Sequence, residues 1–263
     1  GTLRIGHAHL SFPLTVEFAE VASVNRQLES FTVFPSIIMK PRWLSAASRT
    51  LELDEVKILR PLLRVTRSQA GELLWPSFPA VTPPTASAPF LGMRIHSLVV
   101  EDGTIEFLDQ QVQPPFHGVL HHLSVVMGPL AVPGGGPQTS FAIRGEFVGH
   151  SGEAAPVYCS GWAVLTDHDL QASCQLEPLA LSAFEPYYQQ GNVKVRVYSA
   201  TLKSTSQWLV DANALDGRVQ MELGNLTEGD LSIHGRTVVD VKKLAAGEEP
   251  RLTAELKISG PLD

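Results

Sequence analysis

Apolar and polar residues alternate along most of this chain, with the period of two that lets a β-strand bury one face and wet the other. The alternation is clearest in the last third of the chain, where Val, Met, Leu and Ile occupy one set of alternating positions and Lys, Arg, Gln and Glu occupy the other. Spacings of three and four, which would indicate helices, are scarce. The pattern predicts an all-β fold with minor α, built as a meander of antiparallel strands.

Residues 91–109, LGMRIHSLVVEDGTIEFLD, show this alternation on both sides of a turn signal. Between Val100 and Ile105 stands Glu-Asp-Gly-Thr, in which Gly103 can supply the positive φ that hairpin turns need and Asp102 tolerates the same region. The stretch therefore predicts a β-hairpin, and we expect the pattern to recur nearly to the end of the chain.

Breaks in the alternation predict where strands bend or end. Pro61 cannot donate a ladder hydrogen bond and marks an edge or a break within residues 51–66, and the shift at Asp54-Glu55 predicts a bulge. Other strands are expected at residues 3–12, 116–127, 141–147, 157–165, 170–176 and 193–197. Turns are expected at Asp216-Gly217, at residues 228–230 and at residues 246–248.

Helix and linker signals are confined to a few places. Pro41 suits the first turn of a short helix in residues 41–48, and Ser182 can cap a short helical turn that Pro186 limits. The Pro-rich residues 75–89 are typical of an extended loop or linker. We expect an N-terminal β region at residues 1–90 and an antiparallel sheet region at residues 91–263, continuous with the first. Both ends of the chain abut strands, so we expect a longer parent protein.

Composition and charge narrow the class of protein. Charged residues make up 18% of the chain, below the usual ~25%, and apolar residues make up 44%, so the chain is globular and rich in apolar surface. The net charge of −7, with scattered basic residues, argues against a nucleic-acid partner. No run approaches the ~20 apolar residues that span a bilayer. Cys159 and Cys174 are too few for a disulfide scaffold, and either one bridge or two buried thiols fits them.

Signatures of catalysis or metal binding are weak. His7 and His9 would face the same way on a strand, but a third metal ligand is not evident, so surface histidines are the simpler interpretation. No nucleophile motif is present, and the Gly-rich residues 134–136 lack the Lys-Ser/Thr of a phosphate loop. Asp102 belongs to the turn predicted between Val100 and Ile105, which accounts for it without a catalytic role. We therefore expect no catalytic residue, no metal and no cofactor.

A sheet with one apolar face must cover that face with a second sheet, with helices or with a ligand. The sequence supplies almost no helix for this purpose. The candidate positions for a ligand-lined face are Val193, Val195, Val197, Val219, Met221, Leu223, Leu231, Ile233, Leu252, Leu256 and Ile258. The same residues could equally build the core of an ordinary β-sandwich.

Three segments carry a family resemblance through their order and spacing. Residues 54–71, DEVKILRPLLRVTRSQAG, contain a strand, a Pro, a second strand, an Arg and a Gly, and residues 95–109 place Asp-Gly between apolar strands. Residues 179–202 lead from a Pro-Tyr segment into long strands. Together they resemble the AsmA-like envelope proteins, in the branch with the domain of unknown function 748. The resemblance covers roughly residues 51–263, and its departures at residues 72–75 and 199–200 concern the subfamily.

The resemblance implies a Gram-negative envelope protein related to the bridge-like lipid transfer superfamily. Such a protein is tethered to the inner membrane by a helix outside this chain and projects into the periplasm. Its curled sheet with an apolar concave groove would move phospholipid, or another acyl-chain lipid, between the inner and outer membranes and support outer-membrane integrity, alongside envelope protein partners. Two alternatives stay open: a scaffold that assists outer-membrane protein assembly by strand addition, and a closed β-sandwich interaction domain.

Overall fold

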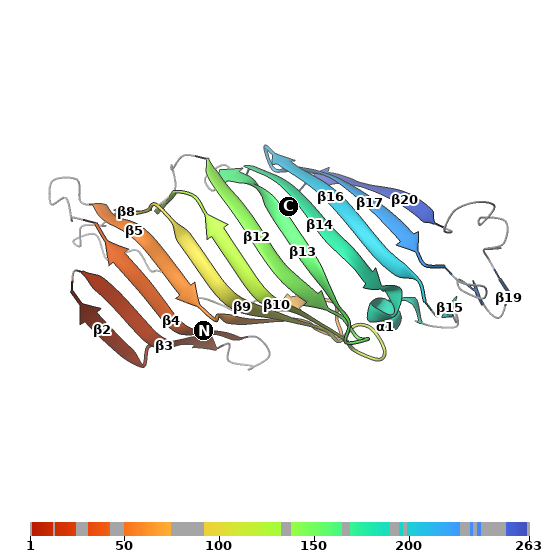
Figure 1. Cartoon of the computed structure of the whole chain (residues 1–263), viewed down its shortest axis with the longest axis horizontal. Helices are drawn as coiled ribbons and strands as arrows, with labels where there is room; N and C mark the ends of the chain where they lie inside the picture. Colours follow the sequence, from red (N-terminus) through yellow and green to blue (C-terminus); the bar gives the residue numbers. More distant parts are fainter. Residues whose placement is uncertain are drawn as a thin grey trace.

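The computed structural model of the chain consists of one large, curved sheet and very little helix (Figure 1). It describes residues 2–12, 14–24, 31–42, 50–74, 92–132, 138–164, 169–189, 195–196, 199–226, 232–233, 236–237 and 251–261. The all-β prediction with minor α is confirmed.

Among the described residues, seventeen strands form the large sheet. Its first nine are β1 (Thr2–Arg4), β2 (His7–Ser11), β3 (Thr15–Val24), β4 (Phe31–Pro41), β5 (Thr50–Leu59), β6 (Leu62–Arg67), β7 (Leu73–Leu74), β8 (Gly92–Ile95) and β9 (Leu98–Asp109). The others are β10 (Phe116–Met127), β11 (Leu130–Val132), β12 (Thr139–Val148), β13 (Ala154–Val164), β14 (Asp169–Ala180), β16 (Thr201–Asp211), β17 (Ala214–Gly224) and β20 (Leu252–Pro261). A separate sheet holds β15 (Val195–Arg196), β18 (Ser232–Ile233) and β19 (Arg236–Thr237).

Neighbouring strands of the large sheet follow each other nearly in chain order. From the β2 edge, the pairing runs through β3, β4, the aligned pieces β5 and β6, then β8 and β9, then β10. It continues through β12, β13, β14, β16 and β17 to β20. Strands on both sides of residues 90 and 91 therefore pair within one sheet.

The hairpin predicted for residues 91–109 is wrong. Residues 98–109 form the single strand β9, which passes through Asp102 and Gly103 without reversing. β9 pairs in parallel with β5 and β6, and β8 pairs in parallel with β5, so the sheet is mixed, although most of its pairings are antiparallel. Asp102 does adopt a positive φ, of 54°, as a turn residue would. Because strands pair with β9 on both sides, the left-handed residue makes a local irregularity and not a turn.

Left-handed residues form a line across this half of the sheet. Glu20, Arg60, Asp102 and His122 have φ values of 57°, 49°, 54° and 50°. The strand pairs just before and just after these positions show which residues lie at the same level. Glu20 is level with Pro35, Pro35 with Arg60, and Arg60 with Asp102. Each left-handed residue costs roughly 1–2 kcal/mol, so pairing on both sides must hold it in place. We call this line the crease, and it bends neighbouring strands at the same level.

Several local predictions can be compared with the structure. Pro61 separates β5 from β6, as expected. The pairs of Lys40 with Glu55 and of Pro41 with Leu53 leave Asp54 extra, which confirms the bulge. The turn predicted at Asp216-Gly217 is wrong because both residues lie inside β17. The reversal occurs instead at Ala212-Asn213, whose φ values are 47° and 64°. The short strand β11 follows Pro129.

The predicted helical break after residue 180 is confirmed. A 3-10 helix, η1 (Leu181–Phe184), leads into α1 (Glu185–Tyr188), which has Pro186 in its first turn. Ser182 is not the cap, because η1 begins after Ala180 without a side-chain cap. Pro41 ends β4, and the rest of the helix predicted there lies outside the described residues. The Pro-rich linker, the Gly-rich residues 134–136 and the turns at 228–230 and 246–248 also lie outside them.

Candidate functional site

The pairing register decides which side chains share a face of the sheet, because residues directly opposite each other on neighbouring strands project from the same face. One residue per strand can be followed in this way from the β2 edge to the β20 edge. We call this the central row: Ala8, Phe18, Ile37, Ile58, Val100, Val125, Ile143, Cys159, Cys174, Ser206, Val219 and Leu256. Ser206 is its only hydrogen-bonding side chain, and the row carries no charge.

The same face is apolar beyond the central row. Two residues further along each strand lies a second complete row: Leu10, Val16, Met39, Val56, Leu98, Met127, Phe141, Gly161, Ala172, Trp208, Gly217 and Ile258. On β12 to β20 the face also includes Thr139, Ala163, Leu170, Val210, Leu215 and Gly260 at one end of the strands, and Gly145, Val157, Leu176, Ser204, Met221, Ala254, Phe147, Ala155, Leu179, Leu202, Leu223 and Leu252 toward the other. These positions together are the apolar face, and none of them is charged.

The opposite face, which we call the polar face, carries six ion pairs. Its ion pairs have N···O distances of 2.5 to 3.5 Å and join Lys40 to Glu55, Lys57 to Glu101, Arg64 to Glu106, Lys203 to Glu177, Arg218 to Glu255 and Arg251 to Glu222. Such exposed pairs contribute little to stability. Their position shows that this face is the one that meets water.

Most of the apolar face is only partly shielded from solvent. No residue of the central row is buried, and Leu256 at the β20 edge is 48% exposed. Along β12, residues of the polar face are exposed or half-buried and those of the apolar face are mostly half-buried. A second sheet packed on this face would bury such side chains almost completely. Among the described residues, no second layer covers the central row.

One end of the apolar face is covered, by η1 and α1, which together we call the cap. Ala183 is fully buried against Ala155 and Leu179, with Phe147, Leu176 and Phe184 packed around them. The ring of Phe184 stacks on those of Phe116 and Phe147, with centroids 6.1 and 5.7 Å apart. Tyr187 lies 4.9 Å from Phe116 by the same measure. The cap is therefore held by a continuous aromatic cluster.

A buried carboxylate anchors the cap to the sheet. Asp109, at the end of β9, is 1% exposed. It accepts hydrogen bonds from the Tyr187 hydroxyl at 3.0 Å and the Gln111 backbone N–H at 2.9 Å, and Arg67 lies 3.4 Å away. Burial, followed by the hydrogen bond to Asp109, raises the pKa of Tyr187 to about 12. Tyr187 therefore stays protonated as the donor at neutral pH.

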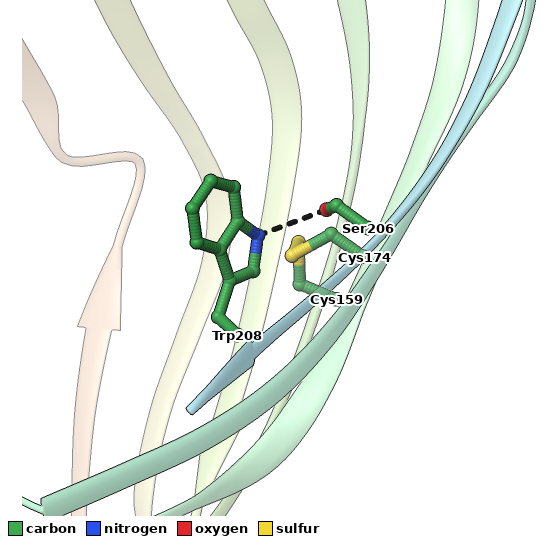
Figure 2. Close-up of a disulfide and its surroundings, with 4 residues drawn as sticks. All are labelled: Cys159, Cys174, Ser206 and Trp208. Atoms are coloured by element: carbon green, nitrogen blue, oxygen red, sulfur yellow. Dashed lines mark hydrogen bonds between the residues drawn. A yellow bond between two sulfur atoms is a disulfide. The ribbon is translucent and has the colours of Figure 1, made fainter. Parts of the chain in front are cut away.

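The two cysteines are bridged and lie within the central row. Cys159 and Cys174 are direct partners on β13 and β14, with Cα atoms 4.1 Å apart. Figure 2 shows both, with Ser206 and Trp208, on the concave side of the bent strands that carry them. The Trp208 indole N–H donates to the Ser206 hydroxyl at 2.9 Å, which satisfies two of the few polar atoms on this face. The apolar face is thus concave here.

The hollows in the described surface lie elsewhere. One, of about 600 Å³, is lined by three consecutive residues from each of β13, β14 and β16, with Gly161, Ala172 and Trp208 in the middle positions. A hollow of about 490 Å³ likewise centres on Ser204, Met221 and Ala254. In each hollow the middle residue of a strand belongs to the apolar face. The residues before and after it project from the polar face and form the walls of the hollow. The first hollow has Trp162 and Leu209 among its walls, and the walls of the second are polar.

The predicted candidates do not all come together. Six lie on the apolar face: Val219, Met221, Leu223, Leu252, Leu256 and Ile258. Val195 and Ile233 pair with each other in the separate small sheet, so the single stripe expected from the pattern is divided. Val193, Val197 and Leu231 lie outside the described residues. Sequence reasoning missed the N-terminal half of the face, such as Ile37, Ile58 and Val100, because bulges interrupt the alternation there.

The histidines that could have bound a metal do not form a site with other described residues. His7 and His9 are exposed on β2. No cluster of three or more His, Cys, Asp or Glu side chains able to hold a metal occurs in the part of the chain that the structure describes. Within the same residues, no helix has the length and apolarity needed to cross a membrane. No protein-family model and no curated protein matches the chain.

Proposed function

We propose that the apolar face binds the acyl chains of lipids and that this chain is a section of a non-enzymatic conduit for phospholipid. The observation that carries the proposal is the central row, which is apolar from one edge of the sheet to the other and uncovered among the described residues. Acyl chains would cover this row and gain ~0.8 kcal/mol for each CH₂ removed from water.

The dimensions of the face suit lipids that move along it. At ~4.8 Å per strand, the central row extends roughly 50 Å, which exceeds the ~30 Å hydrocarbon thickness of a bilayer. No charged side chain interrupts the row, so an acyl chain would meet no desolvation barrier as it passes from strand to strand. Headgroups would stay in water at the strand ends. Movement along the face would need no covalent step.

The proposed setting is the periplasm, between an inner-membrane tether and the outer membrane. Two considerations support it. The resemblance to AsmA-like envelope proteins implies that location, and a disulfide is typical of proteins in oxidising compartments such as the periplasm.

The proposal is tested by native mass spectrometry with lipid extraction on protein purified without detergent. We expect at least one phospholipid per chain, and delivery of a fluorescent phospholipid between vesicles at a rate that rises with protein concentration. Lipid-free protein that neither binds nor moves the probe would contradict the proposal.

A second candidate function is favoured by the two edges of the sheet. Among the described strands, β20 pairs only with β17, and its residues are mostly exposed. An exposed edge offers free N–H and C=O groups to a strand of another protein, as in the addition of a client strand during outer-membrane protein assembly. Replacing Lys257 or Ser259 on β20 with Pro would weaken such pairing without changing the central row. Loss of lipid transfer alone would favour the conduit, and loss of a protein complex alone would favour the scaffold.

A further inference from the structure

The connection between β2 and β3 exposes large apolar side chains to solvent. Phe12 is 97% exposed and Leu14 is 48% exposed, and Leu10, near the end of β2, is exposed as well. Hairpin connections usually hold Gly, Asn, Asp and Ser. Those at residues 149–153 and 212–213 follow this rule, since they consist of Gly, His, Ser, Glu, Ala and Asn. Leu10, Phe12 and Leu14, which together we call the apolar tip, therefore form an unusual surface to present to water.

The apolar tip continues the apolar face at its β2 edge. Leu10 pairs with Val16, and both belong to the second row of that face. Phe12 and Leu14 lie just beyond this pair, in the connection itself. Figure 1 shows β2 and β3 at one end of the sheet. No residue from Leu10 to Val16 is charged, so a lipid that passed from the tip to the face would meet no ionised group on the way.

The size and composition of the tip suit a membrane better than a protein partner. Its three side chains expose a few hundred Å² at most, whereas a stable protein interface takes ~800 Å² from each partner. The next cation along β4, Lys40, is already paired with Glu55 at 2.7 Å. Attraction to a bilayer would therefore come from apolar burial, with an aromatic ring at the interface as in other proteins that lie on membranes.

We propose that the apolar tip inserts into the surface of a phospholipid bilayer and that lipid enters or leaves the apolar face at this end. This inference rests on the proposed function, and it specifies where the conduit meets a membrane. Phe12 enters the outer part of the acyl region, with Leu10 and Leu14 on either side. An acyl chain can then move from the bilayer to Leu10 and Val16 without crossing water.

Flotation of the intact chain with phosphatidylcholine vesicles tests the insertion. We expect binding to neutral vesicles that persists at high salt, because salt does not screen apolar burial. Phe12→Ser should lower the partition coefficient about 10-fold or more, and Leu14→Ser by a smaller factor. Leu209→Ser is the matched control, since Leu209 is 44% exposed on the polar face of β16, and it should leave partition unchanged. Thermal unfolding should be unaltered in all three variants, because the side chains are exposed.

A fluorescent label beside the tip reports insertion directly. Cys159 and Cys174 are bridged, so Ser11→Cys supplies a free thiol for a nitrobenzoxadiazole label. Vesicles should raise its emission and shift it to the blue, and nitroxide-labelled lipids should quench it. The same label on Thr205→Cys, at an exposed position of the polar face, should show neither change.

The binding of a fluorescent fatty acid separates this inference from the proposed function. Phe12→Ser should bind the fatty acid as tightly as the original protein does, yet deliver phospholipid between vesicles about 10-fold more slowly. If it floats and transfers as well as Leu209→Ser does, or if its effect is instead to abolish self-association in analytical ultracentrifugation, the tip is not a membrane contact. If the original protein floats through the tip but binds no fatty acid, the proposed function itself is wrong.

Discussion

Changing Met221 to Asp separates an open lipid-binding face from a closed core. Met221 is half-buried on β17, directly between Ser204 and Ala254 on the neighbouring strands. In the free protein an Asp carboxylate at this position would keep water on its open side, so we expect a loss of only ~1 kcal/mol in the free energy of unfolding. Leu179, which is 1% exposed beneath the cap, is the comparison: Leu179→Asp buries the charge and should cost several kcal/mol.

The effect of Met221→Asp on lipid binding should be much larger than its effect on folding. With neighbours ~4.8 Å away across strands and ~6.8 Å away along the strand, the side chain faces ~33 Å² of bound hydrocarbon, worth only ~0.8 kcal/mol. The dominant change is the carboxylate, which a bound acyl chain would strip of water at a cost of at least ~3 kcal/mol. We therefore expect the affinity for an acyl-chain probe to fall by about 100-fold or more.

Thr205→Asp is the matched control for this change. Thr205 is exposed on the polar face of β16, next to Ser204, and its direct partners Gln175 and Gln220 are uncharged. It introduces the same carboxylate at nearly the same place, but in water, and should alter neither stability nor binding. Urea unfolding and displacement of a fluorescent fatty acid measure both quantities. If Met221→Asp unfolds the protein as Leu179→Asp does, the face is a closed core, and if it binds the probe normally, lipid binds elsewhere.

Three further predictions concern the framework that holds the face. Changing both Cys159 and Cys174 to Ala removes a bridge with a sequence separation of 15 and should lower the free energy of unfolding in urea by ~3 kcal/mol. Reductant should destabilise the original protein and not the variant. If reductant leaves the stability of the original protein unchanged, this prediction is wrong. At Asp102, whose φ is 54°, a change to Val should cost roughly 1–2 kcal/mol and a change to Gly much less, and equal unfolding midpoints would rule out the crease as described. Burial, and to a smaller extent the hydrogen bond to Asp109, raises the pKa of Tyr187 from its ordinary value of 10.0 to about 12. The unfolded chain therefore loses this proton at a lower pH than the folded chain does, and the free energy of unfolding should fall as pH rises from about 10 to 12. Tyr187→Phe should reduce that fall without abolishing it, because the pKa of Tyr188 is also raised to about 12; an unchanged slope would refute the assignment.

The one-sided nature of the sheet could be predicted where the alternation is unbroken. From Val219 to Leu223 and from Leu252 to Ile258 the pattern alone identified the apolar face, because nothing shifts the period of two there. The same period is interrupted in the N-terminal half at Asp54, at Pro61 and around His122. Each interruption moves the apolar residues to the other set of positions, so the face there becomes evident only from the strand pairing.

The failed hairpin shows what a local signal cannot decide. Asp102 and Gly103 satisfy the requirements of a turn, and Asp102 takes the left-handed conformation that a turn would use. Whether the chain then reverses depends on β5 and β6, more than 30 residues away, whose parallel pairing with β9 continues on both sides of Asp102. The cap was predicted as a helix, but its function as a cover depends on Phe116 and Phe147, which reach it only through the curvature of the sheet.

Site-specific photo-crosslinking to lipid tests the central claim most directly. A benzophenone amino acid would replace Val125, Ile143 or Val219 of the central row in one set of variants, and Val126, Arg144 or Arg218 in a matched set. Each position of the second set lies one residue further along the same strand, or one residue before, and therefore on the polar face. With radiolabelled phospholipid, crosslinks confined to the central row would support the conduit. Crosslinks of equal strength from both faces, or from neither, would contradict it.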